Sequence, residues 1–281
     1  MRTVHFISVL AAAALVAILY FGVNTVPPKK AGETASASQA EAASHNARPA
    51  SFDSILSAAR RQLPAHAAEE VSHIENQLAA IGDSSQMAAV FDTLAKIWQD
   101  HKQIHLAAYY YLKAGKLENS EEKLNFAAQL FLDLARKADS ESMQAWYGQM
   151  AIAGFKDALE INPNNETSQV NLAECYIGTG QTMEGVFLLR DITEKHPENV
   201  RANLILGQQG IVSGQLDKAI ERFEKVLNKE PKSVEALLGL AEAYKNKGDK
   251  QKAIDLLEHS KEVMNHPEYS KDIDQYIKTF K

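Results

Sequence analysis

VRANLILGQQGIVSGQLDKAIERFEKVLNKEPKS (residues 200–233) and VEALLGLAEAYKNKGDKQKAIDLLEHSKEVMNHP (residues 234–267) are consecutive stretches of equal length that share one pattern. Equivalent residues recur every 34 positions, and this spacing extends back to Pro163. The residues that keep it are Pro163, Pro197 and Pro231; Gly180, Gly214 and Gly248; Leu172, Leu206 and Leu240; and Gly185, Ala219 and Ala253. Several independent columns at a period of this size indicate stacked helical hairpins. The sequence therefore predicts an all-α solenoid.

Each unit of the pattern is typical of two helices joined by a tight turn. Leu172 and Tyr176 lie four residues apart, so they share one face of a first helix. Gly180 ends that helix, because glycine readily adopts the left-handed conformation found at helix C-termini. A second apolar stripe at residues 186–192 predicts the partner helix, and Pro197 separates it from the next unit.

Residues 166–267 resemble the tetratricopeptide repeat family. That family places a small residue early in its first helix, an aromatic residue three positions later, glycine in the turn, alanine early in the second helix and proline at the end. In the last unit these are Ala241, Tyr244, Gly248, Ala253 and Pro267. The resemblance implies three regular units of 34 residues. The middle unit departs from it at Gly210, where the family prefers a large aromatic residue, and we expect looser packing there.

Residues 51–165 show the same kind of unit in a divergent form. Residues 151–163 match a second helix, and residues 94–98 with residues 107–114 match a helix pair that lacks the turn glycine, with Tyr111 facing the core. Between these two matches, residues 121–137 predict a long helix of a divergent or lengthened repeat. Two more helices are expected upstream, at residues 51–62 and 64–81, the second of which ends at Gly82.

The C-terminal segment, residues 268–281, predicts a capping helix. Its apolar residues Ile273, Tyr276, Ile277 and Phe280 lie on one helical face. The last unit of a solenoid exposes an apolar flank, and an amphipathic helix commonly covers it. The alternative is that this helix folds into the binding groove and occupies it until a partner arrives.

The N-terminal segment predicts a membrane anchor. After a short tail at residues 1–5, residues 6–26 form a run of 21 residues without a charge, followed by Pro27, Pro28, Lys29 and Lys30. About 20 apolar residues suffice to cross a bilayer as a helix, whereas a cleavable signal has a shorter apolar region. We therefore expect an uncleaved transmembrane signal anchor. The charges that flank it are nearly balanced, and a short N-terminal tail favours a single-pass inner-membrane protein with a periplasmic repeat domain.

Residues 27–50 predict a flexible linker between the anchor and the repeats. From Ala31 onward they are mostly Ala, Ser, Glu and Gln, with almost no large apolar residue. Such a segment cannot bury enough surface to offset the entropy lost on ordering.

Charge and residue types give no sign of catalysis, cofactor binding or nucleic-acid binding. The chain has 30 basic and 36 acidic residues, a net charge of −6, and no basic stripe. The single cysteine, Cys175, excludes an intramolecular disulfide and is expected to be a small core residue. His101 and His105 lie four apart but lack the neighbouring glutamate of a zinc protease motif, and His101 is expected at a turn. We expect no catalytic residue, no metal site and no cofactor, and we do not expect an enzyme.

The resemblance implies that the first helix of each hairpin lines a concave groove. The residues expected there are Val170, Glu174 and Ile177 in the first unit, Leu204, Gln208 and Ile211 in the second, and Leu238, Glu242 and Lys245 in the third. This surface is apolar with scattered amide and acidic groups, so the expected ligand is a protein or peptide, for example an amphipathic helix. The alternative is that these apolar residues are buried against neighbouring repeats or the terminal helix.

The anchor, the linker and the groove together predict a membrane-tethered scaffold for protein–protein interaction. Two other functions stay open. One is an assembly factor of the cytochrome c maturation type, which the resemblance permits without singling it out. The other is a structural module that associates with itself by stacking repeats end to end.

Overall fold

The computed structural model describes residues 48–78 and 80–280, which fold into thirteen helices without a strand. In chain order these are α3 (Phe52–Arg60), α4 (Ala65–Leu78), α5 (Ser84–Asp100), α6 (Ile104–Glu118), α7 (Glu121–Arg136), α8 (Glu141–Ile161), α9 (Glu166–Gly178), α10 (Thr182–Lys195), α11 (Val200–Val212), α12 (Leu216–Lys229), α13 (Val234–Lys247), α14 (Lys250–Met264) and α15 (Pro267–Lys278). No helix within the described ranges is long and apolar enough to span a bilayer. The predicted anchor at residues 6–26 and most of the predicted linker lie outside these ranges.

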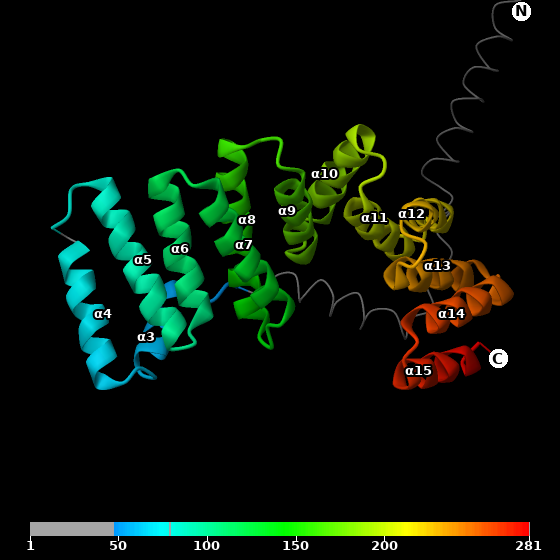
Figure 1. Cartoon of the computed structure of the whole chain (residues 1–281), viewed down its shortest axis with the longest axis horizontal. Helices are drawn as coiled ribbons and strands as arrows, with labels where there is room; N and C mark the ends of the chain where they lie inside the picture. The colour runs from blue at the N-terminus through cyan, green and yellow to red at the C-terminus, as the bar shows by residue number, and fades with distance from the viewer. Residues whose placement is uncertain (1–47, 79, 281) are drawn as a thin grey trace, which may run out of the picture. The chain divides into compact units, whose positions relative to one another are not determined.

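Successive helices from α4 onward lie side by side (Figure 1). The closest pairs are α5 with α6, α7 with α8, α9 with α10, α11 with α12, and α13 with α14. These five hairpins form the solenoid that the 34-residue spacing predicts, and the spacing itself applies to the last three.

The residues that begin and end the helices of the regular units also recur every 34 positions. Asn165, Asn199 and Ser233 cap the N-termini of α9, α11 and α13, and each side-chain oxygen accepts a hydrogen bond from a backbone N–H three residues later. The predicted turn glycines adopt the left-handed conformation, with φ of +83° at Gly180 and +94° at Gly248. The α5–α6 turn lacks a glycine, and there Lys102 takes the same conformation, with φ of +59°.

The helix at residues 121–136 differs from our expectation. It is α7, the first helix of a hairpin whose second helix is the 21-residue α8. It is therefore the first half of a unit that α8 completes, and not a divergent or lengthened repeat by itself. The pattern hid this pairing because α7 matches none of the 34-residue columns.

Two smaller expectations in the divergent region also differ from the structure. Helix α4 ends at Leu78, so Gly82 does not terminate it. In α6, Tyr110 is the buried tyrosine and donates a hydrogen bond to Glu75, while Tyr111 is half-buried and donates to Gln99. The two tyrosines are adjacent in α6, and the apolar spacing of three or four residues on a helical face admits either of them at the buried position.

The looser packing expected at Gly210 is found on one side only, because Gly210 lines a cavity of about 180 Å³ beside α10 but packs closely against α12. A Cβ atom at Gly210 would lie 3.0 Å from the Cβ of Ala219, so α11 and α12 approach too closely for any aromatic residue. The bulk is supplied instead by Phe223 of α12, which is buried between Gly207 and Gly239. The glycine on α11 thus lies opposite a large residue supplied by α12, and the two helices pack closely.

Helix α15 covers the last unit, as expected for a capping helix. Ile273 and Phe280 are buried against Ala241, Ala253 and Leu257. The predicted start at residue 268 is one residue late, because Pro267 occupies the first turn of α15.

Candidate functional site

The first helices of four consecutive hairpins share one cavity of about 650 Å³, which we call the inner groove. Residues of α7, α9, α11 and α13 line it, together with Phe223 from α12. Six of the nine residues expected in a groove lie along it: Glu174, Ile177, Leu204, Gln208, Leu238 and Glu242. The structure thus brings these residues together, while their role in binding stays a prediction.

The floor of the inner groove is apolar and merges with the core. Ile177, Leu204 and Leu238 line it from three successive first helices. Leu204 is only 8% exposed and belongs to the cluster between α11 and α13. Its burial agrees in part with the alternative that groove residues also serve as core, whereas Gln208 beside it is exposed.

The other three expected residues lie elsewhere. Val170 is 3% exposed, packs between α9 and α11, and lines a neighbouring pocket. Ile211 packs partly against the α11–α13 cluster and is not among the groove-lining residues. Lys245 turns toward α15, where its Nζ donates a hydrogen bond to Tyr276 Oη at 2.8 Å.

Helix α15 contacts Lys245 and so covers the α13 end of the set of residues that were predicted to line the groove. Tyr276 Oη also donates to Glu242 Oε2 at 3.0 Å, so one hydroxyl joins both residues of α13 to the terminal helix. The hydrogen bond to Tyr276 is the main cause that raises the pKa of Lys245, because it favours the charged amine. The terminal helix therefore contacts Glu242 and Lys245 and leaves the groove-lining residues of α9 and α11 uncovered.

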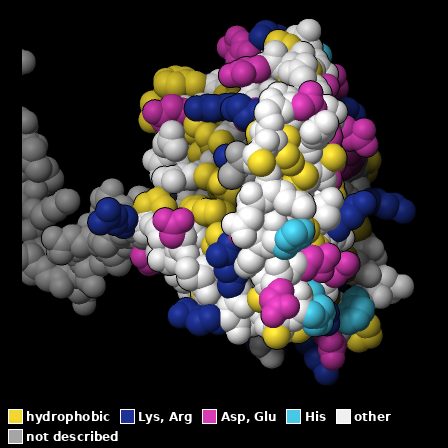
Figure 2. All heavy atoms as spheres, turned by 90° about the vertical axis from the view of Figure 1, so that its left-hand side faces the viewer, with side chains coloured by type: hydrophobic (Ala, Val, Ile, Leu, Met, Phe, Trp, Pro, Cys, Tyr) yellow, Lys and Arg dark blue, Asp and Glu magenta, His cyan; other side chains and the backbone are white. Residues whose placement is uncertain are grey.

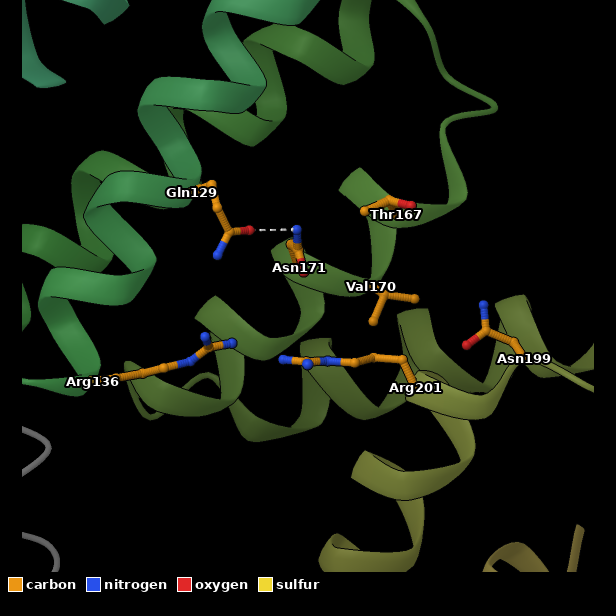
Figure 3. Close-up of a pocket in the computed structure, with 7 residues that line it drawn as sticks. All are labelled: Gln129, Arg136, Thr167, Val170, Asn171, Asn199 and Arg201. Carbon is orange, nitrogen blue, oxygen red and sulfur yellow. Dashed lines mark hydrogen bonds between the residues drawn. The ribbon is translucent and has the colours of Figure 1, made fainter. Parts of the chain in front are cut away.

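A second cavity, of about 280 Å³, adjoins the inner groove and is called here the amide pocket. Its polar lining residues include Gln129, Asn171 and Asn199, with Val170 at its base (Figure 3). Arg136 and Arg201 extend toward each other from opposite sides (Figure 3), and both line the inner groove as well.

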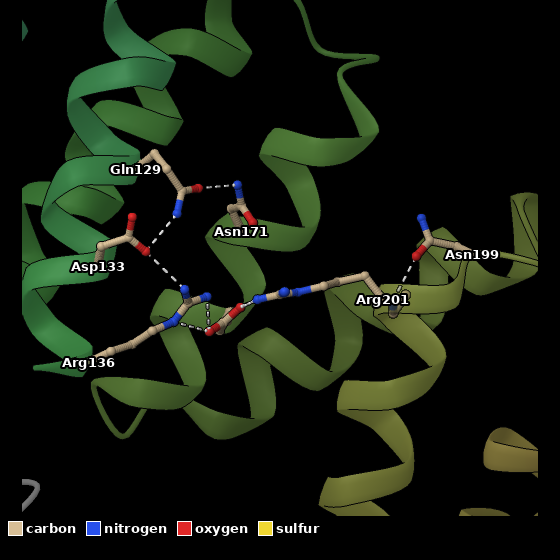
Figure 4. Close-up of polar contacts among 8 residues, drawn as sticks. Gln129, Asp133, Arg136, Asn171, Asn199 and Arg201 are labelled. Atoms are coloured by element: carbon tan, nitrogen blue, oxygen red, sulfur yellow. Dashed lines mark hydrogen bonds and ion pairs between the residues drawn. The ribbon is translucent and has the colours of Figure 1, made fainter. Parts of the chain in front are cut away.

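Glu174 connects the two arginines. Arg136 Nε donates to Glu174 Oε1 at 2.9 Å, and Arg201 donates to the other carboxylate oxygen (Figure 4). Arg136 also donates to Asp133 Oδ1 at 3.0 Å. The four charges alternate along a line from α7 through α9 to α11 and sum to zero.

An amide ladder runs beside these ion pairs. Asn171 donates to Gln129 Oε1 at 2.9 Å, and Gln129 donates to Asp133 Oδ1 at 3.0 Å (Figure 4). Together with the arginines it fixes α7 against α9, across the boundary between the divergent and the regular units.

Sequence reasoning missed Arg136 and Arg201. A signal for Arg201 was available, because Thr167, Arg201 and Glu235 form another 34-residue column and lie one helical turn before Val170, Leu204 and Leu238. All three members of this column line the amide pocket or the inner groove. No such signal pointed to Arg136, because no residue of α7 belongs to a 34-residue column.

The side chains considered for catalysis are placed as the sequence suggested. Cys175 is buried, and burial raises the pKa of its thiol to about 12, so it is a core residue. His101 follows the end of α5, at the turn. Histidines and carboxylates lie close together on the face turned toward the viewer in Figure 2. The rings of His66 and His101 are 6.4 Å apart. Within residues 48–78 and 80–280, no group of three or more His, Cys, Asp or Glu side chains could hold a metal ion.

Comparison with known proteins supports the repeat assignment. The tetratricopeptide repeat family model matches residues 149–208 and 212–271. No curated protein sequence matches the chain. A crystal structure of MamA protein is similar to 66% of this chain over 94% of its own, with 18% identity and a TM-score of 0.51. A crystal structure of PilW, a type IV pilus biogenesis factor, is similar to 74% of this chain over 90% of its own, with 18% identity and a TM-score of 0.50.

These likenesses concern the fold, because the sequence identities are low. They agree with the stacked helical hairpins described above. The described residues form an all-α solenoid of the tetratricopeptide repeat type.

Proposed function

We propose that this protein is a membrane-tethered scaffold that binds a protein or peptide segment in the inner groove. The observation that carries the proposal is the groove itself. It joins an apolar floor to exposed amide and charged groups across four helices. Peptide-binding sites commonly combine apolar pockets for anchoring side chains with polar groups that set orientation. The function proposed here is binding and not catalysis.

The tether belongs to the same proposal and rests on sequence. Residues 6–26 carry no charge over a length sufficient for a bilayer, and the composition of residues 27–50 suits a flexible connection. We place the anchor in the inner membrane and the repeats in the periplasm. Protease added to spheroplasts should then cleave the repeat region, and protection of that region would contradict the proposed topology.

A photo-crosslinking amino acid at Gln208, in the full-length protein in membranes, tests the binding proposal. Gln208 is exposed and lines the groove, whereas Leu204 is buried and would report on the core as well. The matched control is the same amino acid at Glu184, which is exposed on the second helix α10. A discrete foreign protein crosslinked from Gln208 and absent from Glu184 is the expected result. Adducts confined to this chain, or identical from both positions, would contradict the proposal.

One observation favours self-association as a second candidate function. Met183 and Phe187 are 62% and 57% exposed and lie four residues apart on α10, outside the inner groove. Adjacent exposed apolar side chains of this size are common at protein interfaces. Sedimentation of the full-length protein in detergent should show an oligomer that Phe187→Glu dissociates. A monomer at all concentrations would exclude this candidate and leave the scaffold proposal intact.

A further inference from the structure

The two ends of the inner groove carry different charged groups. Arg136 and Arg201 line it where α7, α9 and α11 meet, together with Glu174, which pairs with both, and Glu235 and Glu242 line it on α13. The apolar floor lies between these ends. A bound segment therefore meets paired arginines at one end and carboxylates at the other.

The charged side chains of the groove differ in how many hydrogen bonds and ion pairs they already form within the protein. Arg136 donates to both Asp133 and Glu174, so its charge is well compensated. Arg201 bonds Glu174 through one terminal nitrogen only, and its side chain is 52% exposed. Its other N–H groups form no hydrogen bond to a described residue, so Arg201 can donate hydrogen bonds to an additional carboxylate.

The acidic end is less compensated than the arginine end. Glu235 is exposed in the first turn of α13. Glu242 accepts a hydrogen bond from the neutral Tyr276 hydroxyl. Neither carboxylate forms a direct ion pair with a basic side chain of the described residues, but Lys245 lies near Glu242 through their shared partner Tyr276. A ligand with a basic group at this end would bring a counter-charge for Glu235.

From this distribution we infer that the inner groove binds a peptide segment carrying a carboxylate at one end, apolar side chains in the middle and a basic side chain at the other end. The carboxylate lies at Arg201, the apolar side chains lie over Leu204 and Leu238, and the basic group lies at Glu235 and Glu242. This inference rests on the proposed function and adds the chemistry and the register of the ligand.

The size of the segment follows from helix packing. Arg201 and Glu235 occupy equivalent positions on α11 and α13, and adjacent helices lie about 8–10 Å apart. An extended chain rises about 3.3 Å per residue, so about three or four residues bridge these two positions. A segment with the same charge at both ends would meet one repulsive end, and like-charge contacts select against wrong partners.

Binding of four labelled peptides to the purified full-length protein tests this inference. Each peptide has leucine and alanine in the middle and blocked termini. Two carry glutamate at one end and lysine at the other, in the two opposite orders, one carries glutamate at both ends, and one carries lysine at both ends. We expect at least one mixed-charge peptide to bind about tenfold more tightly than either like-charge peptide.

The variant Glu235→Lys makes the test specific. It should weaken the mixed-charge peptide about five- to tenfold and strengthen the peptide with glutamate at both ends. The matched control is Glu184→Lys, an exposed charge reversal on α10 that should leave all four affinities unchanged. Equal affinities for all four peptides, or an unchanged preference in Glu235→Lys, would overturn the inference.

A third variant separates this inference from the proposed function. Leu238→Asp puts a charge on the groove floor and should abolish binding of every peptide. If the four peptides bind equally and Leu238→Asp abolishes all of them, the groove is a binding site and only the charge order is wrong. If none of the four binds, the inference is overturned, and crosslinking from Gln208 still decides the proposed function.

Discussion

The divergent helices α4–α8 and the regular helices α9–α14 build the same hairpins from different cores. In the divergent region a single cluster extends from α3 into α9, and it contains the buried rings of Trp98, Phe131, Trp146 and Phe155. In the regular region the core is split into smaller clusters, each confined to neighbouring helices. The first region depends on large side chains shared among several helices, and the second on small residues repeated at fixed positions.

The difference shows what the 34-residue pattern encodes. Glycine or alanine in its columns sets how closely two helices approach, and one larger residue then fills the remaining space. Phe223 is the clearest case, because it fits only where Gly207 and Gly239 leave room. In the divergent region Phe131 and Trp146 meet edge to face at 5.4 Å, and no fixed column is needed to place them.

Phe131→Ala should have the largest effect on stability. Phe131 is fully buried at the centre of the shared cluster, so its loss removes buried area and leaves a cavity, at a cost of about 3–5 kcal/mol in free energy of unfolding. Chemical denaturation gives the energy, and hydrogen exchange should show lost protection across α5–α8. The contrasting variant is Leu257→Ala in α14, whose loss of protection should stay within α13–α15. Equally local effects of the two variants would remove the distinction between the regions.

Gly239→Ala should destabilise the regular region by about 1–2 kcal/mol. The added Cβ would lie 2.4 Å from Cζ of Phe223, and this overpacking exceeds the gain in helix propensity. The double variant with Phe223→Leu should recover most of the loss, because leucine occupies the equivalent positions, Leu189 and Leu257. A Gly239→Ala protein as stable as wild type would show that the columns do not control helix approach.

The regular region and its site were the more predictable parts of the chain. One period placed the turns at Gly180, Gly214 and Gly248, and the resemblance to the tetratricopeptide repeat family indicated six residues that share the inner groove. The same period holds the caps at Asn165, Asn199 and Ser233, although we had not used them to set the helix starts.

The divergent region was less predictable for physical reasons. Its helices vary from 14 residues in α4 to 21 in α8, and although α8 keeps columns at Ala151 and Phe155, none survives in α7 to show that the two helices pair. Helix α6 packs against both α5 and α7, so the sequence could not distinguish Tyr110 from Tyr111 as the buried residue. For the same reason Arg136, which reaches Glu174 from a helix without columns, could not be anticipated.

Glu174→Gln tests the connection between the two regions. It removes a charge that is paired with Arg136 on α7 and Arg201 on α11, and the pairs are partly exposed. We therefore expect a loss of about 1 kcal/mol at low ionic strength that shrinks in 1 M salt, because solvent and ions screen such pairs. Asp191→Asn, which breaks a more exposed pair within α10, should cost less than Glu174→Gln. A loss that does not depend on salt would show that Glu174 acts through shape and not through charge.

His105 should give the smallest effect, a pH dependence of the divergent region alone. Burial lowers the pKa of His105 below its ordinary 6.5, because the partly buried ring beside Tyr147 disfavours the charged form. The unfolded chain then binds more protons than the folded one, so the stabilisation is present above pH 6.5 and is lost as the pH falls below that value. Denaturation at pH 7.5 and pH 5 should show that His105→Gln loses less stability on acidification than wild type does, by less than about 1 kcal/mol. The control His259→Gln, at an exposed position of α14, should follow wild type. If His105→Gln lost as much stability on acidification as wild type, the pH sensitivity would lie outside the cluster that extends from α3 into α9.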